Sequence, residues 1–259
     1  MSILAGIGSL VDEWLEIEPK GKPPCYRHRS AALDLSRRDA PITGTRNFLE
    51  ASYAQIHNNW LAAIKAGYSN PSKENWRWKQ NLKLSPENTS PEVRLERSIV
   101  DACGDSWSNQ MPTASGLVGP AADKRAAVDL VYRENPTTYS LIELKVDADN
   151  PLFAAIEILM YGLIFVWSRN NKDRLGYDVK NQPVLATESV TLAVLAPSDY
   201  YRDFELKNLG SAINDGLAEF GGQYALGLGF EFCEFGANHA FDSRQNILRA
   251  MREIFVKRS

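Results

Sequence analysis

The residues best suited to chemistry in this sequence are two acids and a lysine carried by two neighbouring apolar segments. Asp129 lies in the run 128–133, and Glu143 and Lys145 lie in the run 139–146. In both runs apolar side chains alternate with other residues, which predicts two strands. An Asn-Pro pair between the runs predicts a tight turn, so the two strands should form an antiparallel hairpin.

The predicted hairpin brings the two acids together. If it is centred on Pro136, Asp129 lies opposite Glu143, with their Cβ atoms about 4.5–5.5 Å apart, and Lys145 lies on the same face as Glu143. Two carboxylates this close in an apolar setting repel each other and lose solvation unless a cation lies between them. A hard divalent ion, Mg²⁺ or Mn²⁺, would resolve this conflict. We therefore expect Asp129 and Glu143 to bind such an ion, with the Leu144 carbonyl as a further ligand.

A helix before the hairpin carries two more candidate acids. The segment 90–103 begins with Ser-Pro-Glu, which combines an N-cap, a first-position proline and an acid in the first turn. At about 100° per residue, Glu92 and Glu96 fall on the same apolar face as Ile99. Either glutamate could complete a metal site. The alternatives are dipole compensation for Glu92 and a salt bridge with a neighbouring arginine for Glu96.

The predicted elements follow in the order helix, strand, strand with Asp129, strand with Glu143-Leu144-Lys145, helix and strand. Over about residues 90–196, this order and these residues resemble the PD-(D/E)XK nuclease superfamily. The proline of the motif is absent, because a valine precedes the aspartate. The resemblance implies an α/β protein with a restriction-endonuclease-like three-layer core (αβββαβ), in which helices flank a mixed central sheet. It also implies a metal-dependent nuclease in which Asp129 and Glu143 bind Mg²⁺ and Lys145 assists the attack of water on a phosphodiester.

The resemblance implies roles for residues outside the hairpin as well. An acid on the preceding helix often completes the site in this superfamily, which corresponds here to Glu92 or Glu96. Nucleases of the RecB type carry a Gln-x-x-x-Tyr pair on the following helix. Glu157 and Tyr161 have that spacing, with glutamate in place of glutamine, and would position the substrate or the lysine.

A Glu-x-Lys sequence alone is a weak signal, and the chain contains a second copy at 205–207. That copy has no apolar strand before it and no aspartate at hairpin spacing, so we do not assign it to a site.

For Glu143 and Lys145 the simpler interpretation is an exposed cross-strand salt bridge. A nuclease-like module that binds nucleic acid or a protein partner without cutting is the alternative function. Loss of the acids would favour such a module, and all of them are present.

Positive charge is concentrated in one part of the chain. The net charge of −3 argues against a strongly cationic protein that coats nucleic acid, yet residues 20–83 hold twelve basic side chains against four acidic ones, a local charge of +8. Trp60, Trp76 and Trp78 lie in the same segment, and basic residues interleaved with tryptophan suit a phosphate backbone with stacked bases. DNA is therefore the expected partner, ahead of RNA. The alternative is a solvated surface over core tryptophans.

We expect two parts in the chain. Residues 1–88 should form a mainly helical basic extension, with helices over 3–18 and 45–66 and an irregular stretch over 20–39, that grips the duplex or mediates a homodimer. Residues 89–259 should form the nuclease-like domain. Its remaining predicted elements are a strand over 108–118, a buried helix over 152–168, a strand over 190–196, a helix over 206–220, a strand over 224–235 and a closing helix over 242–256.

The sequence predicts a soluble, cytoplasmic protein. The longest apolar run, 152–167, is interrupted by Glu157 and is shorter than the roughly 20 residues that a membrane span needs. The three cysteines are widely spaced and odd in number, which indicates reduced thiols rather than a disulfide framework or a zinc site.

Overall fold

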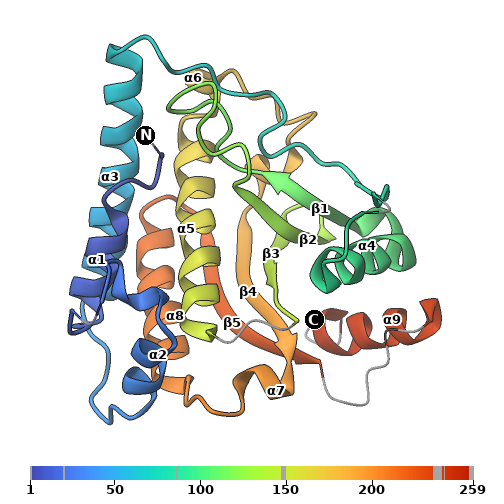
Figure 1. Ribbon diagram of the computed structural model, residues 1–259. Helices are drawn as coiled ribbons and strands as arrows, with labels where there is room; N and C mark the ends of the chain where they lie inside the picture. The colour runs from blue at the N-terminus through green and yellow to red at the C-terminus, as the bar shows by residue number, and fades with distance from the viewer. Residues whose placement is uncertain are drawn as a thin grey trace.

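A five-stranded mixed sheet forms the centre of the protein (Figure 1). The computed structural model describes residues 2–19, 21–85, 87–146, 150–235, 241 and 243–256. The sheet order is β1-β2-β3-β4-β5; β2 pairs antiparallel with both β1 and β3, and β4 pairs parallel with both β3 and β5. The strands are β1 (Trp107–Pro112), β2 (Ala127–Asn135), β3 (Thr138–Leu144), β4 (Ser189–Pro197) and β5 (Gly227–Phe235).

Helices cover both faces of this sheet (Figure 1). On one side lie α3 (Thr45–Lys65), α5 (Pro151–Asn170) and α8 (Lys207–Gly222); on the other lie α4 (Pro91–Cys103) and α9 (Arg244–Met251), which continues into a π-helical turn, Arg252–Val256. The shorter helices are α1 (Ile7–Trp14), α2 (Arg29–Ser36), α6 (Lys172–Leu175) and α7 (Ser198–Tyr201), with 3₁₀ turns η1 (Cys25–Arg27), η2 (Gly104–Ser106) and η3 (Pro183–Ala186). From α4 to β4 the chain follows the predicted order of helix, three strands, helix and strand.

The β2–β3 hairpin has the predicted register. Leu130 pairs with Ile142 and Val131 with Leu141, so the next positions along the two strands are Asp129 and Glu143. The ladder shifts by one residue only beside the turn, after Arg133. Because side chains alternate along a strand, the two acids project to the same face as Val131 and Leu141, which is the face that α5 covers.

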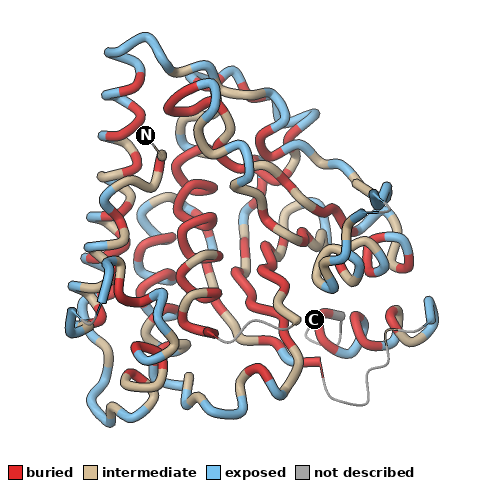
Figure 2. The backbone as a smooth tube through the Cα atoms, viewed as in Figure 1, coloured by how far each residue is buried: buried red, intermediate tan, exposed pale blue. Residues whose placement is uncertain are grey.

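Helix α5 is the predicted core helix. An 18-residue window of it is apolar enough to cross a membrane, but 89% of that window is buried inside the protein, and Figure 2 shows the helix as almost entirely buried. Asn150 caps its first turn by accepting a hydrogen bond from the Phe153 N–H (3.1 Å). Within residues 151–160 the positions that are not buried are Phe153 and Glu157. These two half-buried residues lie one turn apart and form a narrow, part-exposed strip.

The N-terminal part packs directly against the sheet domain. Leu49, Ile56 and Trp60 of α3 belong to the same apolar cluster as α5, together with Ile3 and Val11 from the first residues of the chain. The Trp60 ring meets the edge of Trp167 on α5 at 5.1 Å between ring centroids. Helix α3 and the first residues of the described chain thus form one side of a continuous core.

Several predicted boundaries were wrong. The stretch 20–39, predicted as irregular, contains η1 and α2, because Ala31, Ala32 and Leu35 give α2 a buried face despite the many polar residues around them. The strand predicted over 108–118 ends at Pro112, and Gly116 takes a left-handed φ of 78° in a loop that packs on the 70–72 segment.

Other elements are shorter than predicted. Helix α1 occupies only the middle of the predicted 3–18 helix, and β5 starts three residues later than predicted, at Gly227. The closing helix begins at Arg244; its predicted first residue, Asp242, lies outside the described part of the chain.

Candidate functional site

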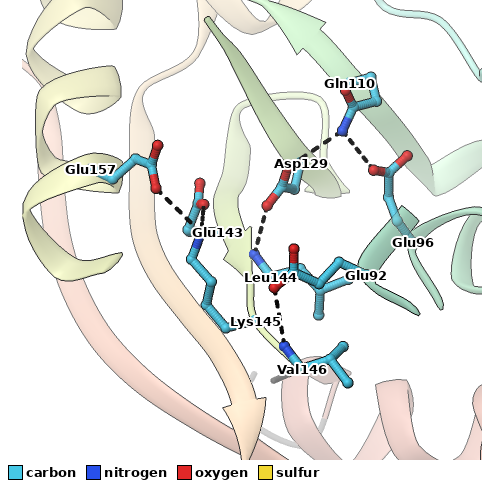
Figure 3. A network of polar contacts seen from close by, with 9 residues as sticks. All are labelled: Glu92, Glu96, Gln110, Asp129, Glu143, Leu144, Lys145, Val146 and Glu157. Carbon is cyan, nitrogen blue, oxygen red and sulfur yellow. Dashed lines mark hydrogen bonds and ion pairs between the residues drawn. The ribbon is translucent and has the colours of Figure 1, made fainter. Parts of the chain in front are cut away.

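Side chains from β2, β3, α4 and α5 converge at one end of the hairpin (Figure 3). Glu143 is only 4% exposed. The Lys145 ammonium lies 2.5 Å from Glu143 Oε1 and 3.2 Å from Glu157 Oε2, so it bridges a strand and helix α5. Lys145 continues the line of β3 because its N–H donates to the Leu195 carbonyl on β4 (2.9 Å). The interpretation of Glu143 and Lys145 as an exposed salt bridge is therefore wrong, since this ion pair is largely buried.

Asp129 is held on both of its oxygens. Oδ2 accepts a hydrogen bond from the Leu144 N–H (3.0 Å), and Oδ1 accepts one from the Gln110 side-chain amide (3.3 Å). Leu144, whose carbonyl was predicted as a metal ligand, thus also fixes the orientation of the aspartate through its N–H. These contacts follow from the hairpin register, which places Asp129 level with the end of β3.

The two glutamates of α4 reach the same end of the sheet. Ser90 caps this helix, as predicted, by accepting a hydrogen bond from Val93 N–H (3.4 Å). Glu92 Oε1 accepts one from the Val146 N–H (3.3 Å), just beyond Lys145. Glu96 is 1% exposed, and in the described part of the chain it takes part in no salt bridge. Both glutamates face the site, as the helical periodicity predicted.

Gln110 is the site residue that the sequence analysis missed. It lies in β1 between Asn109, which pairs with Leu130, and Met111, so it faces Asp129 across the ladder. Its amide donates to Glu96 Oε2 (2.6 Å) as well as to Asp129, while Asn109 Nδ2 donates to Glu96 Oε1 (2.5 Å). Its backbone has a left-handed φ of 47°, which is unfavourable for a non-glycine residue. A glutamine in a strand beside the hairpin was the only sequence signal.

The acids are held in an environment that disfavours their charge. Burial, opposed by the Leu144 N–H, raises the pKa of Asp129 to about 6. Burial also raises the pKa of Glu96 to about 7, against the amides of Asn109 and Gln110. The pKa of Glu143 lies well above its ordinary value because of burial and the nearby Asp129 carboxylate. Carboxyl groups outnumber positive charges here, so an added cation would be stabilised.

Lys145 remains charged. Burial alone would lower the pKa of its ammonium, but Glu143 and Glu157 outweigh that effect and raise it above the ordinary value. Tyr161, one turn after Glu157, is 8% exposed, and burial together with Glu157 raises the pKa of its phenol. The pair at 157 and 161 therefore presents one carboxylate that orients the lysine and one phenol that stays protonated.

The donor chemistry of the hairpin fits a hard divalent ion. Asp129 and Glu143 offer carboxylate oxygens from adjacent strands, and burial raises the pKa of both, so a cation bound between them would favour their charged forms. In the described ranges no group of three or more His, Cys, Asp or Glu side chains is arranged to hold a metal ion. Any ion would thus depend on these two carboxylates with the Leu144 carbonyl and water as further ligands.

The tryptophans predicted to stack on bases do not all reach the surface. Trp76 is fully buried and Trp60 is 3% exposed, so for these two the prediction is wrong. Trp78 is half-buried, with the Arg133 guanidinium 4.9 Å from its ring centroid. Many cations of the basic segment already have partners: Arg29 with Asp203, Arg37 with Asp34, Arg46 with Glu50 and Arg77 with Glu74.

The second Glu-x-Lys sequence is not part of this site. Lys207 is the first residue of α8, its N–H donates to Glu205 Oε1 (2.9 Å), and both side chains are exposed. The same three-residue pattern thus forms a solvated helix start here and a buried ion pair at 143–145.

The chain was compared with models of protein families, with curated proteins and with solved structures, and no match was found in any of the three comparisons. Function is therefore inferred from the residues of the site.

Proposed function

We propose that the protein is a divalent-metal-dependent nuclease with a restriction-endonuclease-like fold that hydrolyses phosphodiester bonds in DNA. The observation that carries the proposal is that Asp129 and Glu143 project from neighbouring positions of adjacent strands, Asp129 half-buried and Glu143 buried, with burial raising the pKa of both and with the Lys145 ammonium against Glu143. A structural salt bridge needs one acid for one base. The carboxyl groups of Asp129, Glu143 and Glu157 outnumber the single Lys145 ammonium, and this surplus of acid is suited to a divalent cation.

Asp129 and Glu143 would hold Mg²⁺ or Mn²⁺. When bound, the ion would lower the pKa of a water molecule and neutralise charge on the phosphate under attack. Glu92 and Glu96 lie on the α4 side and would orient water in the site. Gln110 fixes Asp129 and Glu96 relative to each other through its bridging amide.

Lys145 has the clearest chemical task. Glu143 and Glu157 hold its ammonium in place and keep it protonated. It can donate a hydrogen bond to the attacking water or to a phosphoryl oxygen, and it stabilises the negative charge that grows on phosphorus-bound oxygens in the transition state. Besides the charged Lys145, the phenol of Tyr161 supplies a neutral hydrogen-bond donor close to Glu157.

The test is cleavage of plasmid and oligonucleotide DNA, with RNA in parallel, by the purified protein in Mg²⁺ or Mn²⁺ and in EDTA. We expect metal-dependent cleavage that falls by about 100-fold or more in both Asp129→Asn, which loses a charged ligand of the ion, and Lys145→Ala, which loses the cation that stabilises the developing negative charge. Lys207→Ala is the matched control, since it removes an exposed lysine from the same Glu-x-Lys pattern and should leave the rate unchanged.

Calorimetric titration with Mn²⁺ separates cutting from mere binding. Wild-type protein should bind the ion, and Glu143→Ala should bind it far more weakly. If the ion binds through Glu143 but neither DNA nor RNA is cut, the protein is the non-cutting module. If neither binding nor cleavage is seen, the metal site itself does not exist.

A further inference from the structure

The part-exposed strip of α5 leads away from the candidate site. It consists of Glu157, which contacts Lys145, and Phe153, one helical turn nearer the N-terminus of the helix. On this stretch of α5 the neighbouring positions are buried. A substrate strand that reaches Lys145 can therefore continue over Phe153 without meeting other side chains of the helix.

A segment from the N-terminal part is anchored beside this strip. Asn150 Nδ2 donates to the carbonyls of Tyr26 (3.3 Å) and Arg27 (3.0 Å), while the same side chain caps α5. From the other side, the Asp12 carboxylate accepts hydrogen bonds from the N–H groups of Cys25 (2.7 Å) and Tyr26 (2.8 Å). The backbone of the turn at 25–27 is thus fixed relative to α5.

Arg27 is the exposed cation of this turn. Its guanidinium lies 5.6 Å from the ring centroid of Phe153 and 5.9 Å from that of Tyr26. No acidic side chain of the described chain forms an ion pair with it, in contrast to Arg29, which pairs with Asp203. Stacking on aromatic rings restricts the guanidinium but leaves its N–H donors available to an anion.

We propose that Arg27 binds a backbone phosphate of the same substrate strand that is cleaved at Lys145. This inference rests on the proposed function and assigns a substrate-binding role to the N-terminal part. Both cations border the same part-exposed strip of α5, since Arg27 lies over Phe153 and Lys145 pairs with Glu157. Two cations that border one strip suit a chain of phosphates, whereas a single small phosphate ester would engage Lys145 alone.

The test measures binding rather than cleavage. A fluorescein-labelled DNA duplex with single-stranded ends is titrated with wild-type protein in EDTA over a series of salt concentrations. We expect Arg27→Ala to bind about three- to tenfold more weakly and to lower the slope of log K against log salt by about 0.7–0.9, the effect of one lost phosphate contact. Arg27→Lys should retain the slope, and Lys207→Ala, which removes an exposed lysine outside the basic segment 20–83, should behave like wild type.

Melting temperatures of the variants exclude a folding defect. An unchanged slope in Arg27→Ala, an equal loss in Arg27→Lys, or absence of DNA binding by the wild-type protein would overturn the assignment of Arg27. Cleavage by the wild type in Mn²⁺ is scored separately. Cleavage by the wild type together with an unchanged slope in Arg27→Ala would contradict only the phosphate contact. A reduced slope in Arg27→Ala without cleavage by the wild type would contradict only the nuclease activity.

Discussion

At the scale of single residues, Gln110 shows how the site is held together. Asp129 and Glu96 would repel each other if both were ionised, and the Gln110 amide, which donates to both, compensates part of that repulsion. The residue keeps a left-handed backbone that costs on the order of 1 kcal/mol. Strand pairing does not require a left-handed backbone, so we attribute this unfavourable conformation to the hydrogen bonds that Gln110 makes to Asp129 and Glu96.

We predict that Gln110→Ala weakens Mn²⁺ binding by about 10- to 100-fold, because residues that orient metal ligands typically have effects of this size. Calorimetric titration of the variant measures the change. Gln80→Ala is the control, since that glutamine donates to the backbone carbonyls of Gly104 and Trp107 and does not contact the acids. Equal Mn²⁺ affinity in wild type and Gln110→Ala would show that the bridge has no role in the site.

At the scale of elements, Asn150 links two parts of the molecule. It is 7% exposed, accepts from the first turn of α5 and donates to two carbonyls of the turn at 25–27. The helix that carries Glu157 and the segment that carries Arg27 therefore depend on the same side chain for their relative position.

We predict that Asn150→Asp lowers the free energy of unfolding by about 2 kcal/mol, because a carboxylate can still cap the helix but cannot donate to the two carbonyls. Asn150→Ser should cost less, since its hydroxyl caps the helix without introducing a buried charge. Urea denaturation measures both, with Ser90→Ala on α4 as a variant that loses a cap alone, about 1 kcal/mol. A stability of Asn150→Asp equal to that of wild type would contradict the dual role.

At the scale of the whole molecule, the N-terminal part completes the core. Helix α3 covers α5 with Leu49, Ile56 and Trp60, all of which are 3% exposed or less. Removing it would expose the most apolar helix of the chain to water.

We predict that a fragment of residues 89–259 does not unfold cooperatively and binds a hydrophobic dye, while the full chain melts in one transition. Thermal melting followed by circular dichroism, together with dye fluorescence, measures this. A soluble fragment with a sharp transition would instead support the two-domain division expected from the sequence.

The sequence by itself determined the hairpin, its register and the acidic face of α4, because strand alternation, a turn at Pro136 and helical periodicity are local patterns. It also determined that α5 is a core helix. These local signals were sufficient to predict that Asp129, Glu143 and Lys145 meet.

Only the tertiary structure decided what surrounds them. The bridge from Gln110 depends on a left-handed φ that local sequence does not specify, and the burial of Trp60 and Trp76 depends on helices distant in the chain. Arg27 comes to α5 through hydrogen bonds that span more than a hundred residues. Contacts between distant segments have no periodicity in the sequence, so their partners emerge only when the chain is folded.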